Sequence, residues 1–156
     1  MLRVYLKNQR GFTMIELVML IFLLSLSVAI AAPSLDINGG QVNMAVIKVA
    51  QELNYAQNRA IVTGIPHGFR TTSSHGYEIY EGTTGNAIWN PSTGQPFNVD
   101  LNDYFNSVNF QGDYSVEFDA LGRPDAAGDL TFVLSNGEET NTFTVEYNTG
   151  RVALPF

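Results

Sequence analysis

The pattern of hydrophobic and polar positions divides this chain of 156 residues into three stretches. From Leu17 to Ala32 the sequence is apolar apart from two serines. Between residues 41 and 64, apolar residues recur at alternating steps of four and three. After Pro66, apolar and polar residues alternate at every second position in several short runs. The pattern predicts an apolar helix, an amphipathic helix and a β-rich body, in that order.

The first stretch is long enough to cross a bilayer as a helix. Residues 12–32 would rise about 31 Å at ~1.5 Å per residue, close to a hydrocarbon core of roughly 30 Å. Residues 1–11 contain three basic side chains and no acid, whereas the remainder has five basic and fifteen acidic ones. Basic residues favour the cytoplasmic side. We therefore expect a transmembrane helix at 12–32, with the N-terminus in the cytoplasm and the body outside.

A cleaved secretory signal peptide is the alternative interpretation of the same stretch. Ala29-Ile30-Ala31 supplies an A-x-A cleavage pattern just before Pro33, and cleavage there would release a soluble protein such as a secreted enzyme. Glu16 argues against this alternative because it lies at the inner edge of the apolar run. An acid at the bilayer centre costs about 2.5–3.5 kcal/mol on insertion scales, and less near the edge. Composition alone leaves both interpretations open.

The residues around Glu16 resemble a known processing signal. The run Gly11-Phe12-Thr13-Met14-Ile15-Glu16-Leu17-Val18 is similar to the prepilin motif of type IV pilins and pseudopilins. The resemblance implies that a prepilin peptidase cuts between Gly11 and Phe12 and methylates the new amine of Phe12, so that residues 1–11 are a leader. It also implies that Glu16 pairs with the N-terminal amine of a neighbouring subunit. Such pairing removes an unpaired buried charge.

A break separates the two predicted helices. Pro33 matches a proline that many members of this family carry, and it would kink or end a helix because it lacks a backbone donor. Asp36-Ile37-Asn38-Gly39-Gly40 is a stronger breaker. We expect a joint at 33–40, and the sequence leaves open whether the helix is continuous through it.

The amphipathic helix is predicted at 41–64, where Gly64-Ile65-Pro66 ends it. We expect its apolar stripe to pack on its own domain, with a face for a partner helix as the alternative. The stripe consists of Val42, Val46, Val49, Leu53, Ala56 and Ala60.

The remaining residues, 65–156, are expected to form a β-rich head. Alternation predicts strands at 77–80, 114–119, 130–135 and 142–147, and Asn136-Gly137 and Asn148-Thr149-Gly150 are hairpin turns. Glycines and prolines interrupt the pattern at about 82–109, where we expect a long, partly ordered loop. The predicted fold class is α+β, with a long N-terminal helix, transmembrane plus amphipathic, packed on an antiparallel β-sheet or sandwich.

Further runs resemble the GspH/FimT branch of minor pseudopilins and minor pilins: Leu53, Ala56, Arg59 and Ala60 in the helix, Phe118–Pro124, and Thr149-Gly150-Arg151-Val152. This resemblance implies a minor pseudopilin of type II secretion, at or near the tip of the periplasmic pseudopilus, that helps to initiate assembly. The alternative is a minor pilin of a type IV pilus, with a role in assembly or DNA uptake. The implied partners are other minor and major pseudopilins, the prepilin peptidase and an inner-membrane assembly platform. The implied location is the bacterial inner membrane, crossed once, with a periplasmic head.

No motif in the sequence predicts catalysis, a cofactor or a metal centre. Cysteine is absent, which excludes disulfides and thiolate metal sites. His67 and His75 lie eight residues apart without metal-ligand spacing and are expected at the surface. Asp119, Asp125 and Asp129 could ligate calcium, but their spacing is not that of an EF-hand, so we expect a solvated turn.

Nucleic acid is disfavoured as a partner. Beyond the leader the chain carries a net charge of −10, which repels phosphate backbones. Arg123 and Arg151 are the residues that could meet DNA if the head bound it.

Overall fold

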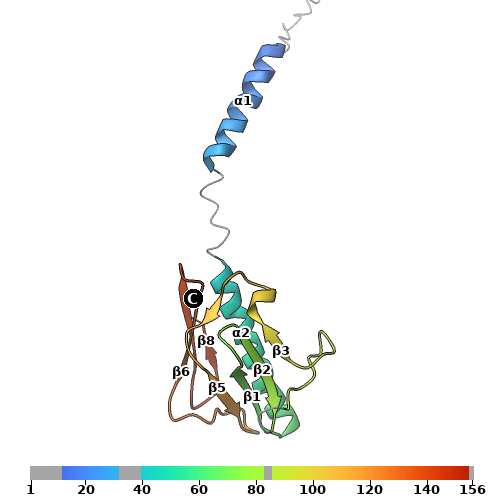
Figure 1. The fold of residues 1–156 in the computed structure, drawn as a ribbon, viewed down its shortest axis with the longest axis vertical. Helices are drawn as coiled ribbons and strands as arrows, with labels where there is room; N and C mark the ends of the chain where they lie inside the picture. Colours follow the sequence, from blue (N-terminus) through green and yellow to red (C-terminus); the bar gives the residue numbers. More distant parts are fainter. Residues whose placement is uncertain (1–11, 32–39, 83–85, 155–156) are drawn as a thin grey trace, which may run out of the picture. The chain divides into compact units, whose positions relative to one another are not determined.

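The computed structural model describes residues 12–31, 40–82 and 86–154 (Figure 1). The chain forms two compact units, Met1–Ile37 and Asn38–Phe156. In the first unit lies helix α1 (Met14–Ala31), within the predicted helix at 12–32. The features predicted at Gly11, at Pro33 and at 36–39 fall outside the described residues.

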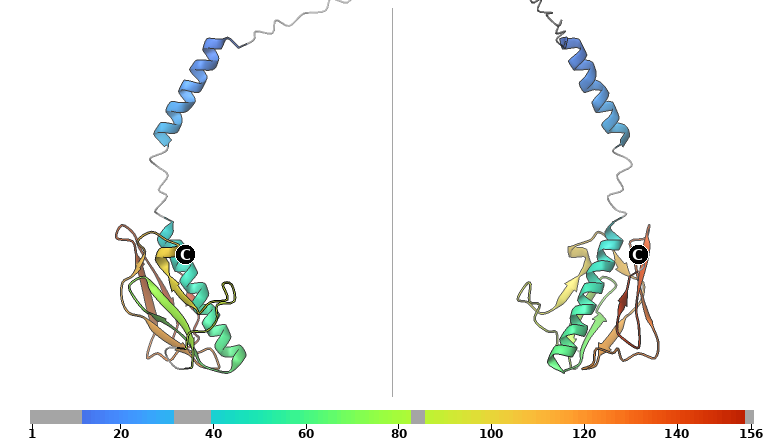
Figure 2. Two further views of the ribbon diagram at one scale, coloured as in Figure 1. Left: turned by 45° about the vertical axis from the view of Figure 1, so that its right-hand side comes forward. Right: turned by 180° about the vertical axis from the view of Figure 1, so that it is seen from behind.

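The second unit is the head, in which one long helix packs on two antiparallel sheets (Figures 1 and 2). Its elements are α2 (Gln41–Thr63), β1 (His67–Thr71), β2 (Gly76–Glu81), β3 (Asn98–Asp100), the 3-10 helix η2 (Leu101–Asp103), β4 (Asn109–Phe110), β5 (Ser115–Phe118), β6 (Leu130–Ser135), β7 (Thr140–Val145) and β8 (Val152–Ala153). The strand orders are β3-β2-β1-β5 and β4-β6-β7-β8, and α2 contacts strands of both sheets. The predicted α+β class is confirmed.

Helix α2 follows the predicted amphipathic pattern. All six residues of the predicted stripe are buried, together with Ala45 and Ala50. The helix ends at Gly64, which has a φ of 69° and donates its N–H to the carbonyl of Ala60 at 2.9 Å. Glycine reaches this left-handed conformation without steric penalty. The stripe packs on the sheets of the same head, as the sequence predicts.

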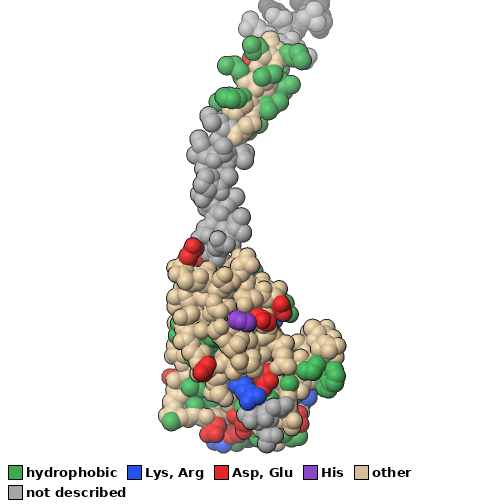
Figure 3. All heavy atoms as spheres, viewed as in Figure 1, with side chains coloured by type: hydrophobic (Ala, Val, Ile, Leu, Met, Phe, Trp, Pro, Cys, Tyr) green, Lys and Arg blue, Asp and Glu red, His purple; other side chains and the backbone are tan. Residues whose placement is uncertain are grey.

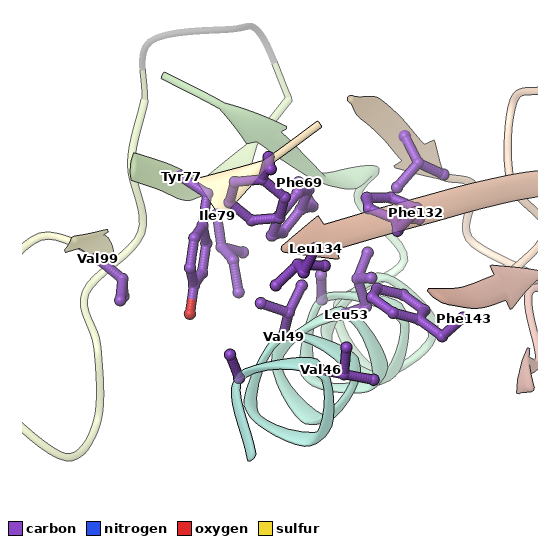
Figure 4. Close-up of a cluster of buried hydrophobic side chains, with 14 of the residues drawn as sticks. Val46, Val49, Leu53, Phe69, Tyr77, Ile79, Val99, Phe132, Leu134 and Phe143 are labelled. Carbon is purple, nitrogen blue, oxygen red and sulfur yellow. The ribbon is translucent and has the colours of Figure 1, made fainter. Parts of the chain in front are cut away.

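The core between α2 and the sheets is rich in aromatic rings (Figure 4). The ring of Phe132 stacks on Phe143 at a centroid distance of 4.8 Å and on Tyr114 at 4.6 Å. It also meets Phe69 of the other sheet edge-on at 5.7 Å. Offset-stacked and edge-on pairs stabilise beyond the area they bury. Phe132 therefore connects the two sheets through direct ring contacts.

The alternating pattern located β2, β5, β6 and β7 but not β1, which lies between β2 and β5. The sequence of β1 contains polar His67 and Arg70, which obscure the pattern of a central strand. In the sheet these residues stand opposite acids, His67 opposite Glu81 and Arg70 opposite Glu78. Arg70 Nε donates to Glu78 Oε1 at 2.6 Å. The ion pair with Glu78 therefore accounts for the charged side chain of Arg70 in a central strand.

The prediction of a long loop at about 82–109 is wrong, because this segment contains β3, η2 and the start of β4. Its buried residues are Phe97, Val99, Leu101 and Val108. Residues 86–97 form a narrow arm at the edge of β2, in which Ile88 donates its N–H to Ile79 at 3.0 Å and Phe97 donates to Ile88 at 2.7 Å. We call residues 86–97 the arm. It projects from the side of the head (Figures 1 and 2).

One side chain of α2 is bonded to turns from both sheets. Gln57 Nε2 donates to the carbonyl oxygens of Gly122 and Thr149, both at 2.8 Å. Gly122 follows β5 in one sheet, and Thr149 lies between β7 and β8 in the other. Gly122 and Gly150 both have positive φ angles, 76° and 68°. The two turns thus require glycine where they approach the helix.

Candidate functional site

The first turn of α1 holds the carboxylate of Glu16. Thr13 donates to Glu16 Oε2 through both its backbone N–H and its Oγ1, each at 3.0 Å. In return, the N–H of Glu16 donates to Thr13 Oγ1 at 3.3 Å. This reciprocal arrangement is a capping box, which satisfies N–H groups that the first helical turn leaves without partners. It fixes the acid of the predicted assembly site at the N-terminal end of the helix.

Apolar side chains are exposed on all sides of the described part of α1. Phe12 is 76% exposed and Met14 87%, and large apolar residues continue to Leu24. Among the helices that the structure describes, none is both long enough and apolar enough to cross a membrane.

The two histidines occupy different environments. His75 is partly exposed, and its Nδ1 lies 2.9 Å from Asp100 Oδ1. His67 is fully buried, so the expectation that it lies at the surface is wrong. Its Nδ1 donates to the carbonyl of Ile65 at 2.8 Å, because a carbonyl oxygen can only accept. The structure therefore gives His67 a place in the core, at the end of β1.

The aspartates considered as calcium ligands have separate roles. Asp119 Oδ1 accepts from the N–H groups of Leu121 and Arg123, both at 2.9 Å, and its Oδ2 accepts from the guanidinium of Arg123. These hydrogen bonds, led by the backbone N–H of Arg123, hold the pKa of Asp119 below its ordinary value. Asp129 Oδ1 accepts from the N–H of Tyr147 at 3.0 Å. Within the described ranges no group of three or more potential ligands is placed to hold a metal ion.

The predicted N-terminal signal is matched by a known family. Residues 6–32 match the family described as the prokaryotic N-terminal methylation motif. None of the curated proteins matches the sequence. Two crystal forms of the type IV minor pilin FimU of Pseudomonas aeruginosa strain PAO1 are similar in structure. One has a TM-score of 0.58 at 15% identity, over 75% of this chain and 90% of that chain. The other has a TM-score of 0.55 at 14% identity, over 73% and 92%.

The chain has the fold of a type IV minor pilin. At these identities the similarity shows the fold alone, and the N-terminal motif is a separate finding. Together they agree with the resemblance that the sequence carries to pilins and pseudopilins.

The head contains a polar cluster around the buried Tyr77 that the sequence did not reveal. Tyr77 donates its hydroxyl to Glu52 Oε2, and Lys48 Nζ lies 2.7 Å from Glu52 Oε1 and 4.4 Å from the ring centroid of Tyr104. Burial raises the pKa of Tyr77 far above its ordinary value, and the nearby charge of Glu52 raises it further. Tyr77 therefore stays protonated and serves as a donor. The cluster joins α2 to β2 and to Tyr104, the residue after η2.

The two arginines considered for DNA are engaged in ion pairs on the head. Arg123 is paired with Asp119, and Arg151 donates through Nε to Glu146 Oε1 at 3.1 Å. On the face shown in Figure 3, acidic side chains are scattered over the head. The described head thus offers no strongly basic surface at these two positions.

The pair formed by Glu146 and Arg151 predicts a pH dependence. Hydrogen bonds from Arg151 and Thr149 hold the pKa of Glu146 below its ordinary value of 4.5. A carboxyl whose pKa is lowered by folding stabilises the fold above the unfolded pKa and loses that contribution as pH falls through the folded pKa. Glu146→Gln should therefore lower stability near neutral pH, and its difference from wild type should shrink below pH 4.5.

Chemical unfolding at a series of pH values measures this difference. Glu138→Gln is the control, because the Glu138 carboxylate forms no ion pair or hydrogen bond with the other described residues. A difference between Glu146→Gln and wild type that stays constant in acid would contradict the prediction.

Proposed function

We propose that the chain is a minor structural subunit of a type IV pilin-like filament. The observation that supports this most directly is the N-terminal methylation motif at residues 6–32 in a chain whose head has the minor pilin fold. In this proposal the prepilin peptidase cleaves between Gly11 and Phe12 and methylates Phe12. Residues 12–32, of which α1 is the described part, anchor the subunit in the inner membrane with the head in the periplasm. The role is structural and requires no catalytic group.

The geometry at Glu16 supports a role in assembly. The capping box holds its carboxylate at the start of α1, four residues after the amine that cleavage would create on Phe12. A neighbouring subunit would offer an equivalent amine, and pairing the two charges would remove an isolated charge from the membrane. Pairing at this position would also set the axial offset between adjacent subunits.

Within this class we propose a minor pseudopilin of type II secretion, at or near the tip of the pseudopilus. The acidic composition of the body supports this system over one that handles DNA. Its partners would be other minor and major pseudopilins and the inner-membrane assembly platform. The second candidate is a minor pilin of a type IV pilus, which the structural similarity to FimU favours.

Mass spectrometry of the mature protein tests the processing step. A mature chain that begins at methylated Phe12 supports the proposal. A chain that begins at Ala32 would instead identify a secretory signal peptide and exclude filament assembly through α1.

Deletion of the gene distinguishes the two systems. Loss of extracellular enzymes from the culture medium, with normal surface pili, would support the pseudopilin. Loss of pili or of twitching motility, with normal secretion, would support the minor pilin.

Replacing Glu16 should block assembly without blocking cleavage. Glu16→Ala is expected to be processed at Gly11 and to reduce incorporation into sheared filaments at least tenfold, a loss of about 1.4 kcal/mol or more. Glu16→Gln is the matched variant, because an amide retains a hydrogen-bond acceptor for Thr13 but lacks the charge. If charge pairing drives assembly, both variants should fail. Normal incorporation of Glu16→Gln would show that the charge is not required.

A further inference from the structure

Arg59, on the last turns of α2, differs from the other basic residues of the head. Each of the others described there forms an ion pair with an acid: Lys48, Arg70, Arg123 and Arg151. Among the described residues Arg59 forms none, and its Nε is buried without a hydrogen-bond partner. A buried donor left without a partner destabilises a protein. Arg59 therefore retains an unused capacity to bind an acceptor.

A cavity of about 300 Å³ lies beside Arg59, between α2 and the arm. Its lining consists of Arg59, Glu81, Asn86, Ala87, Ile88 and Trp89. The acid in this cavity faces another residue, because Glu81 Oε2 lies 3.3 Å from Nε2 of the buried His67. No ion pair joins Glu81 to Arg59. Among the described residues the guanidinium of Arg59 thus has no ion-pair partner, and Glu81 lines the same cavity without pairing to it.

The other wall of the cavity is apolar and belongs to the arm. Trp89 is the single tryptophan of the chain and is 69% exposed, next to the partly buried Ile88. An exposed tryptophan on a projecting segment is a common anchor of protein interfaces. The cavity therefore combines an indole, an aliphatic side chain and one unpaired guanidinium.

We propose that Arg59 and Trp89 form a docking site for an acidic side chain of a partner protein. The planar guanidinium would bind the carboxylate through paired N–H donors, and Trp89 would cover apolar atoms that flank it. The partner carries a carboxylate on a protein rather than a phosphate backbone, because Arg59, the one unpaired cation among the described residues of the head, lies in a head whose charges are mostly acidic. The site belongs to the head and does not depend on processing of the N-terminus.

Two peptides that differ in one charge test the proposal. The full-length chain in a nonionic maltoside detergent is titrated with Ac-Phe-Glu-Phe-NH2 or with Ac-Phe-Gln-Phe-NH2, and the fluorescence of Trp89 reports binding without a label. The glutamate peptide should bind saturably and about tenfold more tightly than the glutamine peptide, as expected for one charge-assisted pair. Equal affinity for the two peptides would overturn the proposal without any variant being needed.

Variants then assign the effect to Arg59. Arg59→Gln should abolish the preference for glutamate, whereas Arg151→Gln, which removes an exposed arginine already paired with Glu146, should leave it unchanged. If Arg59→Gln does not fold, Arg59→Lys decides, because lysine keeps the charge but not the planar fork. If Arg59→Lys binds the glutamate peptide more weakly than wild type but still prefers it to the glutamine peptide, the site is supported. If Arg59→Lys shows the same preference as wild type, the proposal is overturned.

A competition with free acetate tests whether the carboxylate must be carried by a protein. Acetate should displace the glutamate peptide only at concentrations far above that of the peptide, because it makes no contact with Trp89. If acetate displaces the glutamate peptide at matched concentrations, the proposal of a protein partner is overturned and a small carboxylate is the ligand.

Discussion

Replacing Gly150 with alanine is expected to lower the free energy of unfolding of the head by about 2–5 kcal/mol, the sum of backbone strain and overpacking. Gly150 has a φ of 68°, which side chains other than glycine rarely adopt. A Cβ at this position would overlap the carbonyl oxygen of Gly122 and Nε2 of Gln57. The substitution would therefore strain the turn and also displace Gln57 from its hydrogen bonds.

Gly137→Ala is the matched control for this prediction. Gly137 has a φ of 92°, but a Cβ there would meet no atom within 4 Å. Its cost should be limited to the backbone conformation, about 1–2 kcal/mol. Denaturant unfolding followed by near-UV circular dichroism, which reports the buried rings, measures both variants. Equal losses would show that the close approach at Gly150 has no energetic consequence.

Phe132→Ala should lower the free energy of unfolding by about 3–5 kcal/mol, because it removes a large buried ring and leaves a cavity. Phe132 is fully buried and contacts rings from both sheets. A loss of this size is a large fraction of the stability of a small domain, typically about 5–15 kcal/mol in total. We therefore also expect less of this variant to accumulate in cells.

Two further variants bracket the effect at Phe132. Phe132→Leu keeps most of the apolar volume and should lose less stability. Tyr147→Ala removes a ring that is 45% exposed and should lose least. The order of the three losses, measured by the same unfolding experiment, is the test. A loss for Phe132→Ala no larger than that for Tyr147→Ala would contradict the assigned core.

The sequence predicts the parts of the fold in which hydrophobic period and burial coincide. Helix α2 has one buried stripe, so a period of 3.6 identifies it. Strands β6 and β7 are joined at Asn136-Gly137 and form a hairpin whose register places Ser135 opposite Thr140. In these elements the residues that the local pattern marks as apolar are also the ones that tertiary packing buries.

Strand β3 was missed although a signal for it is present. Phe97, Val99 and Leu101 alternate with polar residues and are buried, which is the period of a strand. Glycines and prolines just before Phe97 hid this short run. Those residues belong to the arm, which leads directly into β3.

The polar interactions of the head could not be predicted from spacing along the chain. Glu52 and Tyr77 lie 25 residues apart and come from α2 and β2. The cavity beside Arg59 forms only where the end of α2, the end of β2 and the arm come together. Such sites depend on how elements pack, which a single sequence does not encode as a local pattern. The N-terminal methylation motif is different, because its residues are contiguous and form a linear pattern that the sequence shows directly.

The hydrogen bonds of Gln57 have a mechanical consequence. In the proposed filament subunit, a pulling force on α2 must pass from this helix into the sheets of the head. The amide of Gln57 holds carbonyl groups from both sheets, so sliding α2 along its axis would break bonds to both at once. Load applied to α2 at Gln57 is thus divided between two turns, one from each sheet.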